Sequence, residues 1–178
     1  MKHPGIALLL TAVILLTGCS SLVSINSFGE PSEIDPALAG TWKRNDEIFV
    51  LHPGDATYTI LYTGASDSGA VRLEGRLLKT AEFEVLELTS AAAPDPFQIP
   101  AHLWVRVWPE ESVLRWAYLD SAWLKEKARQ HLTTQVLGEA FTKRMLLAAP
   151  EADVRSFLLR HAADRRAFGD IRVMQRVQ

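Results

Sequence analysis

The amino-acid sequence predicts a mainly β fold with some α structure: an antiparallel meander that closes into a barrel or half-barrel, with about two helices in the last third. Three observations predict it. Apolar and polar residues alternate with period two through the middle of the chain, which is typical of strands. Turn-forming runs such as His52-Pro53-Gly54-Asp55 separate these segments at short intervals. After Asp120 the apolar period changes to about 3.6, which indicates helices.

The expected elements follow in chain order. Strands are expected over residues 41–44, 48–51, 57–63, 71–77, 83–88, 103–108 and 113–118. Within the run 83–88 the alternation changes phase after Val85, which predicts a bulge. Ser121 is expected to cap a helix that runs to Gln130, and Pro150 to begin a second one. Strands over 143–147 and 171–177 complete the chain.

Three parts are expected along the 178 residues, a length that suits one folded domain. Residues 1–18 form a signal peptide, and residues 36–178 form the β-rich domain. Between them, residues 19–35 are rich in Ser, Asn, Gly and Pro and show no periodicity, which predicts a flexible tether. Such a tether would reach roughly 20–25 Å.

The N-terminus combines a charged start with a short apolar run over residues 6–16, interrupted by Thr11. The run is shorter than the roughly 20 residues that a spanning helix needs, so it predicts a secretory signal and not a permanent anchor. It ends in Leu16-Thr17-Gly18-Cys19. This sequence resembles the lipobox of bacterial lipoproteins: an aliphatic residue, two small residues and a cysteine.

The resemblance implies cleavage between Gly18 and Cys19, with diacylglycerol on the Cys19 thiol and an acyl chain on its new amine. Cys19 is the only cysteine of the chain. Lipidation would leave no free thiol in an oxidising compartment. Three acyl chains anchor a protein far more firmly than one. Ser20 follows Cys19 where Asp would imply retention at the inner membrane, so the resemblance favours the outer membrane of the cell envelope.

Composition excludes several classes of function. The net charge of −2 argues against a nucleic-acid partner, which selects a basic excess. One cysteine excludes an internal disulfide framework and a multi-cysteine metal site. The histidines show no metal-binding spacing, and His102 is expected to cap a strand or lie half-buried. No cofactor is expected beyond the covalent lipid.

No catalytic constellation stands out in the chain. Glu82, Glu84 and Glu87 lie close together, but alternation places Glu82 and Glu84 on the wet face of a strand, opposite Phe83 and Val85. A general acid needs a carboxyl group with a raised pKa in an apolar cleft. The sequence therefore predicts a protein that is not an enzyme.

Aromatic and charged residues leave alternatives open. Trp104 and Trp108 share one strand face with Arg106, a face that lines the mouth of a cup, lies under a helix or packs in the core. From Lys125 onward there are 11 basic and 6 acidic residues, against 7 and 15 in residues 19–124. This asymmetry indicates either a basic face for anionic lipid headgroups or helices that balance an acidic sheet.

The folded part opens with Leu38-Ala39-Gly40-Thr41-Trp42. A glycine, any residue and a tryptophan on the first strand resembles the opening motif of lipocalins. Three further segments resemble bacterial lipocalin-like lipoproteins of uncharacterised function: Ile99-Pro100-Ala101-His102-Leu103, Leu119-Asp120-Ser121-Ala122-Trp123-Leu124 and Val154-Arg155-Ser156-Phe157-Leu158. Two helices in the last third depart from the single helix of lipocalins, so a barrel partly plugged by helices is an equal alternative to a sealed, ligand-filled eight-stranded barrel.

The lipocalin resemblance also implies structural roles for single residues. Gly40 and Trp42 would be structural, with Trp42 buried at the closed end of the barrel. In lipocalins an arginine from a late strand covers this tryptophan. Arg172 and Arg176 lie on the last expected strand, and Arg176 is the predicted partner of Trp42, with Val173 and Val177 completing the core edge.

Two classes of function follow. In the first, a lipid-anchored lipocalin-like protein binds an apolar small molecule or an envelope lipid in its cup. In the second, a structural or accessory envelope protein with a filled interior holds another protein by its surface. An apolar cavity continuous with solvent would favour the first class, and an interior filled by side chains would favour the second.

Overall fold

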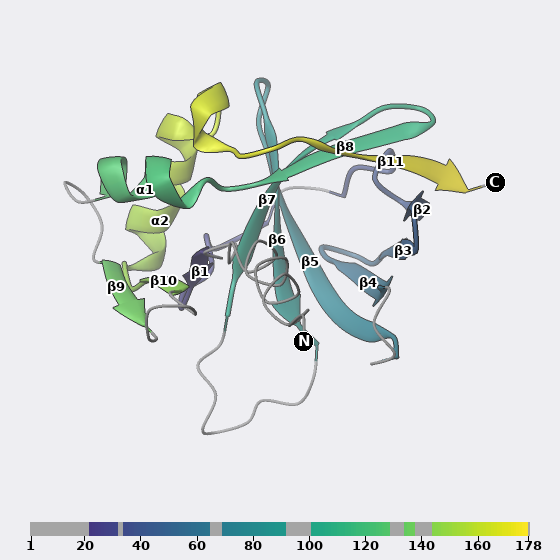
Figure 1. The fold of residues 1–178 in the computed structure, drawn as a ribbon, viewed down its shortest axis with the longest axis horizontal. Helices are drawn as coiled ribbons and strands as arrows, with labels where there is room; N and C mark the ends of the chain where they lie inside the picture. The colour runs from purple at the N-terminus through teal and green to yellow at the C-terminus, as the bar shows by residue number, and fades with distance from the viewer. Residues whose placement is uncertain are drawn as a thin grey trace, which may run out of the picture.

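The computed structural model describes residues 22–31, 34–64, 69–91, 101–128, 134–137 and 144–177. Eight of its strands close into an antiparallel barrel (Figure 1). Around the barrel they run β2 (Gly40–Arg44), β3 (Glu47–Pro53), β4 (Tyr58–Thr63), β5 (Val71–Lys79), β6 (Glu84–Ser90), β7 (Leu103–Pro109), β8 (Val113–Tyr118) and β11 (Arg172–Val177). The last strand pairs with both β8 and β2 and closes the barrel.

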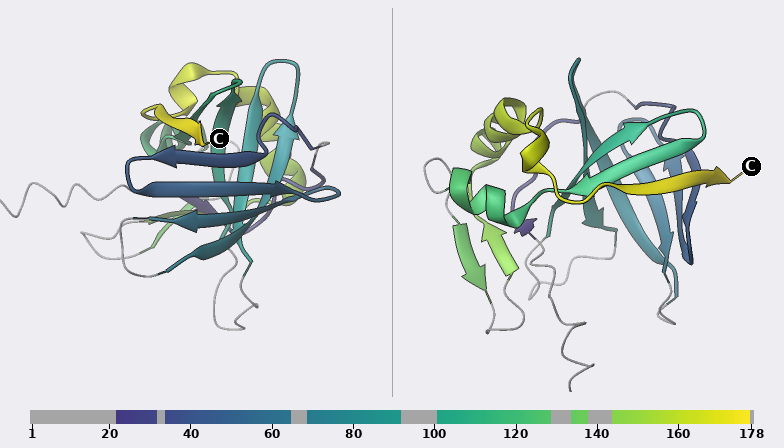
Figure 2. Two further views of the ribbon diagram at one scale, coloured as in Figure 1. Left: turned by 90° about the vertical axis from the view of Figure 1, so that its right-hand side faces the viewer. Right: turned by 45° about the horizontal axis from the view of Figure 1, so that its top comes forward.

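The chain between β8 and β11 forms a side layer on the barrel. It contains α1 (Ser121–Ala128), β9 (Thr134–Leu137), β10 (Arg144–Leu147), α2 (Glu151–His161) and the 3₁₀ turn η2 (Arg165–Ala167). Figure 2 shows α1 and α2 together on one side of the barrel. The fold-class prediction, a mainly β chain with a lipocalin-like barrel and about two helices in the last third, is confirmed, and the barrel is closed.

Both helices begin where local chemistry favours it. The Asp120 carboxylate accepts a hydrogen bond from the Trp123 backbone N–H at 2.6 Å, so Asp120 caps α1 where Ser121 was expected. Pro150 precedes α2 with an extended backbone, and Glu151 and Asp153 lie in the first turn. Their negative charges are favourable there because the N-terminus of a helix carries a partial positive charge.

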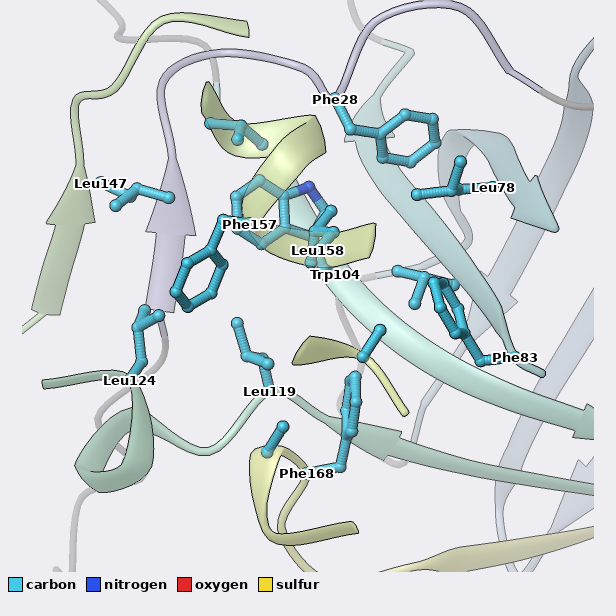
Figure 3. Packing of buried hydrophobic residues seen from close by; sticks show 14 of the residues in the cluster. Phe28, Leu78, Phe83, Trp104, Leu119, Leu124, Leu147, Phe157, Leu158 and Phe168 are labelled. Atoms are coloured by element: carbon cyan, nitrogen blue, oxygen red, sulfur yellow. The ribbon is translucent and has the colours of Figure 1, made fainter. Parts of the chain in front are cut away.

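Two hydrophobic cores hold the molecule together. The first lies inside the barrel and includes Leu38, Trp42, Tyr58, Ile60, Leu77 and Met174. The second lies between the outer wall of β6 and β7 and the side layer, where Trp104 packs among Phe157 and Leu158 of α2 (Figure 3). Both faces of the sheet are therefore buried along β6 and β7.

This double burial corrects two predictions. The expected bulge after Val85 is absent, because β6 pairs in continuous register with β5 and β7. Glu84 was expected on the wet face, opposite Val85. In the structure Val85 is fully buried in the second core, and Glu84 takes the opposite face at the closed end of the barrel. Alternation misleads here because neither face of the strand is open to water.

The prediction of a flexible tether over 19–35 is wrong for residues 22–31. Strand β1 (Leu22–Ser24) pairs in parallel with β10, which in turn pairs with β9. Phe28 is fully buried in the second core, and the Asn26 side chain donates to the Ala149 carbonyl at 2.7 Å. The Arg155 guanidinium donates to the Glu30 carbonyl at 2.8 Å. This stretch is part of the folded domain.

The predicted signal peptide, with Gly18 and Cys19 at its cleavage site, lies outside the described residues. Within the described residues, no helix combines the length and apolar character needed to cross a bilayer.

Candidate functional site

The closed end of the barrel is fastened by Arg176 and Trp42. The Arg176 guanidinium lies 4.2 Å from the centroid of the Trp42 ring, and the two residues are cross-strand partners in β11 and β2. Its nitrogens donate to the backbone carbonyls of Ala37, Ala39 and Glu111 at 2.7–2.9 Å. The prediction that Arg176 covers a buried Trp42 is confirmed. Val173 and Val177 are exposed, however, and Met174 supplies the core contact of β11.

Gly40 is required where it stands for two reasons. Its φ is +128°, a region that L side chains rarely adopt. A Cβ at this position would also lie 2.6 Å from the Arg176 Nη1 atom. The glycine therefore lets the guanidinium reach the Ala39 carbonyl, and its predicted structural role is confirmed.

A polar cluster completes the closed end. The Lys79 ammonium pairs with Asp35 and, at 2.7 Å, with Glu84. Burial raises the pKa of Glu84, and burial also raises the pKa of Tyr58 to about 12. The Tyr58 hydroxyl accepts from the Asp35 backbone N–H at 2.7 Å. These contacts join Asp35 to β4 and β5, and β5 to β6, at the closed end of the barrel, while the buried Glu84 Oε2 atom has no hydrogen-bond partner among the described residues.

An apolar recess occupies the other half of the barrel. Its cavity volume is about 50 Å³. It is lined by Phe49, Leu51, Ile60, Leu86, Leu88, Val105, Val107, Leu114, Trp116, Tyr118 and Met174. Every lining residue carries a large apolar surface, so the recess favours an apolar group.

Aromatic rings and one cation surround the recess. Phe49 stands 4.5 Å from Tyr62 and 6.2 Å from Trp116, and Trp116 meets Tyr118 edge-on at 4.9 Å, all between ring centroids. The Arg172 guanidinium lies 5.0 Å from the Trp116 ring and 5.4 Å from the Tyr118 ring. The mouth therefore combines aromatic walls with a positive charge.

One polar atom in this apolar lining lacks a partner. The Trp116 indole N–H is buried and has no hydrogen-bond acceptor among the described residues. An unsatisfied buried donor costs roughly 1–3 kcal/mol. A ligand with an apolar body and an oxygen acceptor could satisfy this donor and meet Arg172 as well.

Glu87 forms the most buried ionic cluster of the described chain. Its side chain is fully buried and accepts from the Phe28 N–H at 3.0 Å, the Ser27 hydroxyl at 2.9 Å and the Trp104 indole at 3.2 Å. His102 Nδ1 lies 3.2 Å from Glu87 Oε1. Burial alone would raise the pKa of Glu87, but the nearby His102 imidazole and the hydrogen bonds from the Phe28 N–H and the Ser27 hydroxyl outweigh it and hold the pKa below its ordinary value.

This cluster is structural in its geometry. It fastens the 22–31 segment to the outer face of β6. His102 lies half-buried at the start of β7, which was one of the two positions expected for it. His52 is exposed near the end of β3, and His161 packs against Trp123 and Phe157. The described ranges contain no group of three His, Cys, Asp or Glu residues arranged to hold a metal ion.

Sequence reasoning missed several residues that the structure brings together. The recess draws on six strands, so spacing along the chain does not reveal it. For Glu87 a signal existed: a carboxylate inside the run Val85-Leu86-Glu87-Leu88 indicates a buried charge with partners. The face shared by Trp104, Arg106 and Trp108 was recognised as unusual, and it lies under the side layer.

No protein-family model, curated protein sequence or solved structure matches this chain.

Proposed function

We propose that the protein is a lipid-anchored lipocalin-like protein of the bacterial cell envelope, whose barrel binds the apolar part of a small amphiphile. The observation that carries the proposal is the apolar recess, which contains the unpartnered Trp116 N–H and has Arg172 beside its aromatic wall. The apolar lining would receive a hydrocarbon chain. The indole N–H and the guanidinium would receive an oxygen-bearing, anionic end.

The size of the recess limits the ligand. A cavity of about 50 Å³ is too small for a whole phospholipid, and ligand pockets typically enclose about 300–1,000 Å³. The proposal is therefore that the recess takes the end of an acyl chain, such as that of a medium-chain fatty acid, bound without chemical change.

The lipobox resemblance supports the envelope location through Cys19. Only three residue steps separate Cys19 from the first described strand residue, Leu22, a span of at most about 11 Å. The long tether expected from composition is thus reduced to a short one. A lipidated Cys19 would hold the β1 side of the domain against the outer-membrane surface.

The structural class of function keeps one observation in its favour. The closed half of the barrel is filled by its own side chains, with Trp42, Tyr58 and Leu77 fully buried. An accessory protein that acts by surface contacts needs nothing more. The two classes differ in one testable property, which is entry of a ligand into the recess.

Photo-crosslinking tests the proposal. The full chain in nanodiscs is irradiated with a decanoic acid that carries a diazirine at the end of its chain, and modified peptides are mapped by mass spectrometry. We expect modification of recess residues such as Phe49 and Leu88.

Two tryptophan variants sharpen this test. Leu88→Trp adds bulk inside the recess and should abolish the modification. Leu61→Trp makes the same change on the outer face of β4, where Leu61 is 38% exposed, and should leave it intact. Modification confined to outer-face residues, or undiminished in Leu88→Trp, would exclude the barrel as the site.

A further inference from the structure

A second pocket lies outside the barrel, where β7 and β8 meet the segment between η2 and β11. Its volume is about 320 Å³. Three arginines reach it, Arg106, Arg115 and Arg165, and its apolar walls are Trp108, Phe168 and Ile171. The pocket is therefore much roomier than the barrel recess and strongly cationic.

Arg106 is the unusual member of this group. It is only 7% exposed, its Nε atom is buried without a hydrogen-bond partner, and Nη1 donates to the Ala162 carbonyl. The guanidinium lies 4.9 Å from the Trp108 ring and 5.6 Å from the Phe168 ring. Among the described residues, no carboxylate forms an ion pair with it.

A buried cation normally has a carboxylate partner, because its desolvation is costly. Burial and the charge of Arg165 both lower the pKa of Arg106, in keeping with an uncompensated positive site. Arg115 is neutralised by Glu110, but Arg165 is exposed and has no ion pair among the described residues. Two positive charges at this pocket are thus left without a counter-charge from the described chain.

We propose that this pocket binds the phosphate group of an organic phosphate. A phosphate monoester carries a charge of about −1.5 to −2 at neutral pH, which matches the two uncompensated guanidinium groups. The guanidinium group of arginine often forms two parallel hydrogen bonds with the oxygens of one phosphate group. The pocket exceeds what a bare phosphate fills, and Trp108, Phe168 and the 57% exposed Ile171 provide apolar contact for the organic part. This site is independent of the barrel recess.

The phosphate could belong to a soluble metabolite or to a lipid headgroup. Titration calorimetry of the full chain in nonionic detergent micelles distinguishes the sources. Glycerol 3-phosphate represents the soluble group, glycerol is its uncharged control, and dioctanoyl phosphatidic acid represents the lipid. We expect both phosphates to bind and glycerol not to bind. A preference of tenfold or more for phosphatidic acid assigns the site to lipid headgroups, and equal affinities assign it to soluble phosphates.

Two adjacent arginines form a matched pair of variants. Arg165→Gln removes a pocket cation and should weaken phosphate binding about tenfold, as expected for one lost charge-assisted contact. Arg166→Gln removes the neighbouring charge, which pairs with Asp164 and does not line the pocket, and should leave the affinity unchanged.

Arg106→Met keeps the side-chain length, removes the buried charge and should abolish phosphate binding. Absence of binding to the wild-type chain overturns the proposal. Equal weakening by Arg165→Gln and Arg166→Gln also overturns it, because it would show attraction to net charge and not to this pocket.

Discussion

At the residue scale, the contact between Arg176 and Trp42 joins the first barrel strand to the last. The guanidinium contributes a cation–π contact of roughly 0.5–2 kcal/mol together with hydrogen bonds to three backbone carbonyls. We expect Arg176→Ala to lower the free energy of unfolding by about 2–4 kcal/mol in chemical denaturation. Arg166→Ala, which removes an exposed arginine, is the control and should leave the midpoint unchanged. Equal denaturation midpoints for both variants would show that the contact between Arg176 and Trp42 does not stabilise the barrel.

Gly40, which lies beside Arg176, allows a second test of this contact. Gly40→Ala places a Cβ 2.6 Å from Arg176 Nη1 at a φ of +128°. The backbone strain alone costs about 1–3 kcal/mol, so a loss of stability of at least this size is expected. Gly169→Ala is the matched control, since its nearest neighbours would lie at 3.9 Å or more. Thermal unfolding of both variants measures the difference.

At the element scale, Glu87 fastens β1 and the following residues to β6. Its pKa is below the ordinary value of 4.5, so its stabilising contribution is present above that value and is lost as the pH falls through the folded pKa. We expect the Phe28 amide to lose protection from hydrogen exchange on acidification below about pH 4.5, before the barrel unfolds.

Glu87→Gln should abolish this pH dependence and lower the stability of the 22–31 segment by about 1–3 kcal/mol, because buried donors lose their anionic acceptor. Glu82→Gln changes an exposed carboxyl group on the preceding turn and is the control. Acid-dependent release that persists in Glu87→Gln would assign the transition to another group.

Most strands of the barrel, but not all strands of the molecule, could be predicted from the sequence. Strands β2 to β8 and β11 were predictable because alternation and turn residues mark each of them. Strands β1 and β9 were missed, since three or four residues are too few to show a period. The sequence could not show which faces of β6 and β7 are buried, because α2 covers their outer face, which would otherwise be exposed to water and polar. Trp42 and Arg176 could be paired in advance, whereas the recess and the Arg106 pocket arise from strands distant in sequence.

At the scale of the whole molecule, the barrel and its side layer form one unit, and its first described residue, Leu22, stands three residues after Cys19. If Cys19 carries the lipid, Cys19→Ala should abolish both acylation and lipoprotein-type cleavage. Metabolic labelling with an alkyne fatty acid should lose its band in this variant, and the chain should leave the membrane fraction or remain uncleaved. Undiminished labelling would contradict the lipobox interpretation and leave the barrel unaffected.

If the barrel recess receives a small amphiphile, the Trp116 indole N–H reports its binding most directly. The full chain is labelled with ¹⁵N-tryptophan in nanodiscs and titrated with decanoic acid, and the Trp116→Phe variant assigns the signal. We expect a saturable downfield shift of the Trp116 N–H signal as this group gains an acceptor, while the signal of the Trp42 N–H, which donates to the Leu38 carbonyl at 2.9 Å, does not move. A Trp116 signal that stays fixed, or moves together with that of Trp42, would contradict amphiphile binding in the recess.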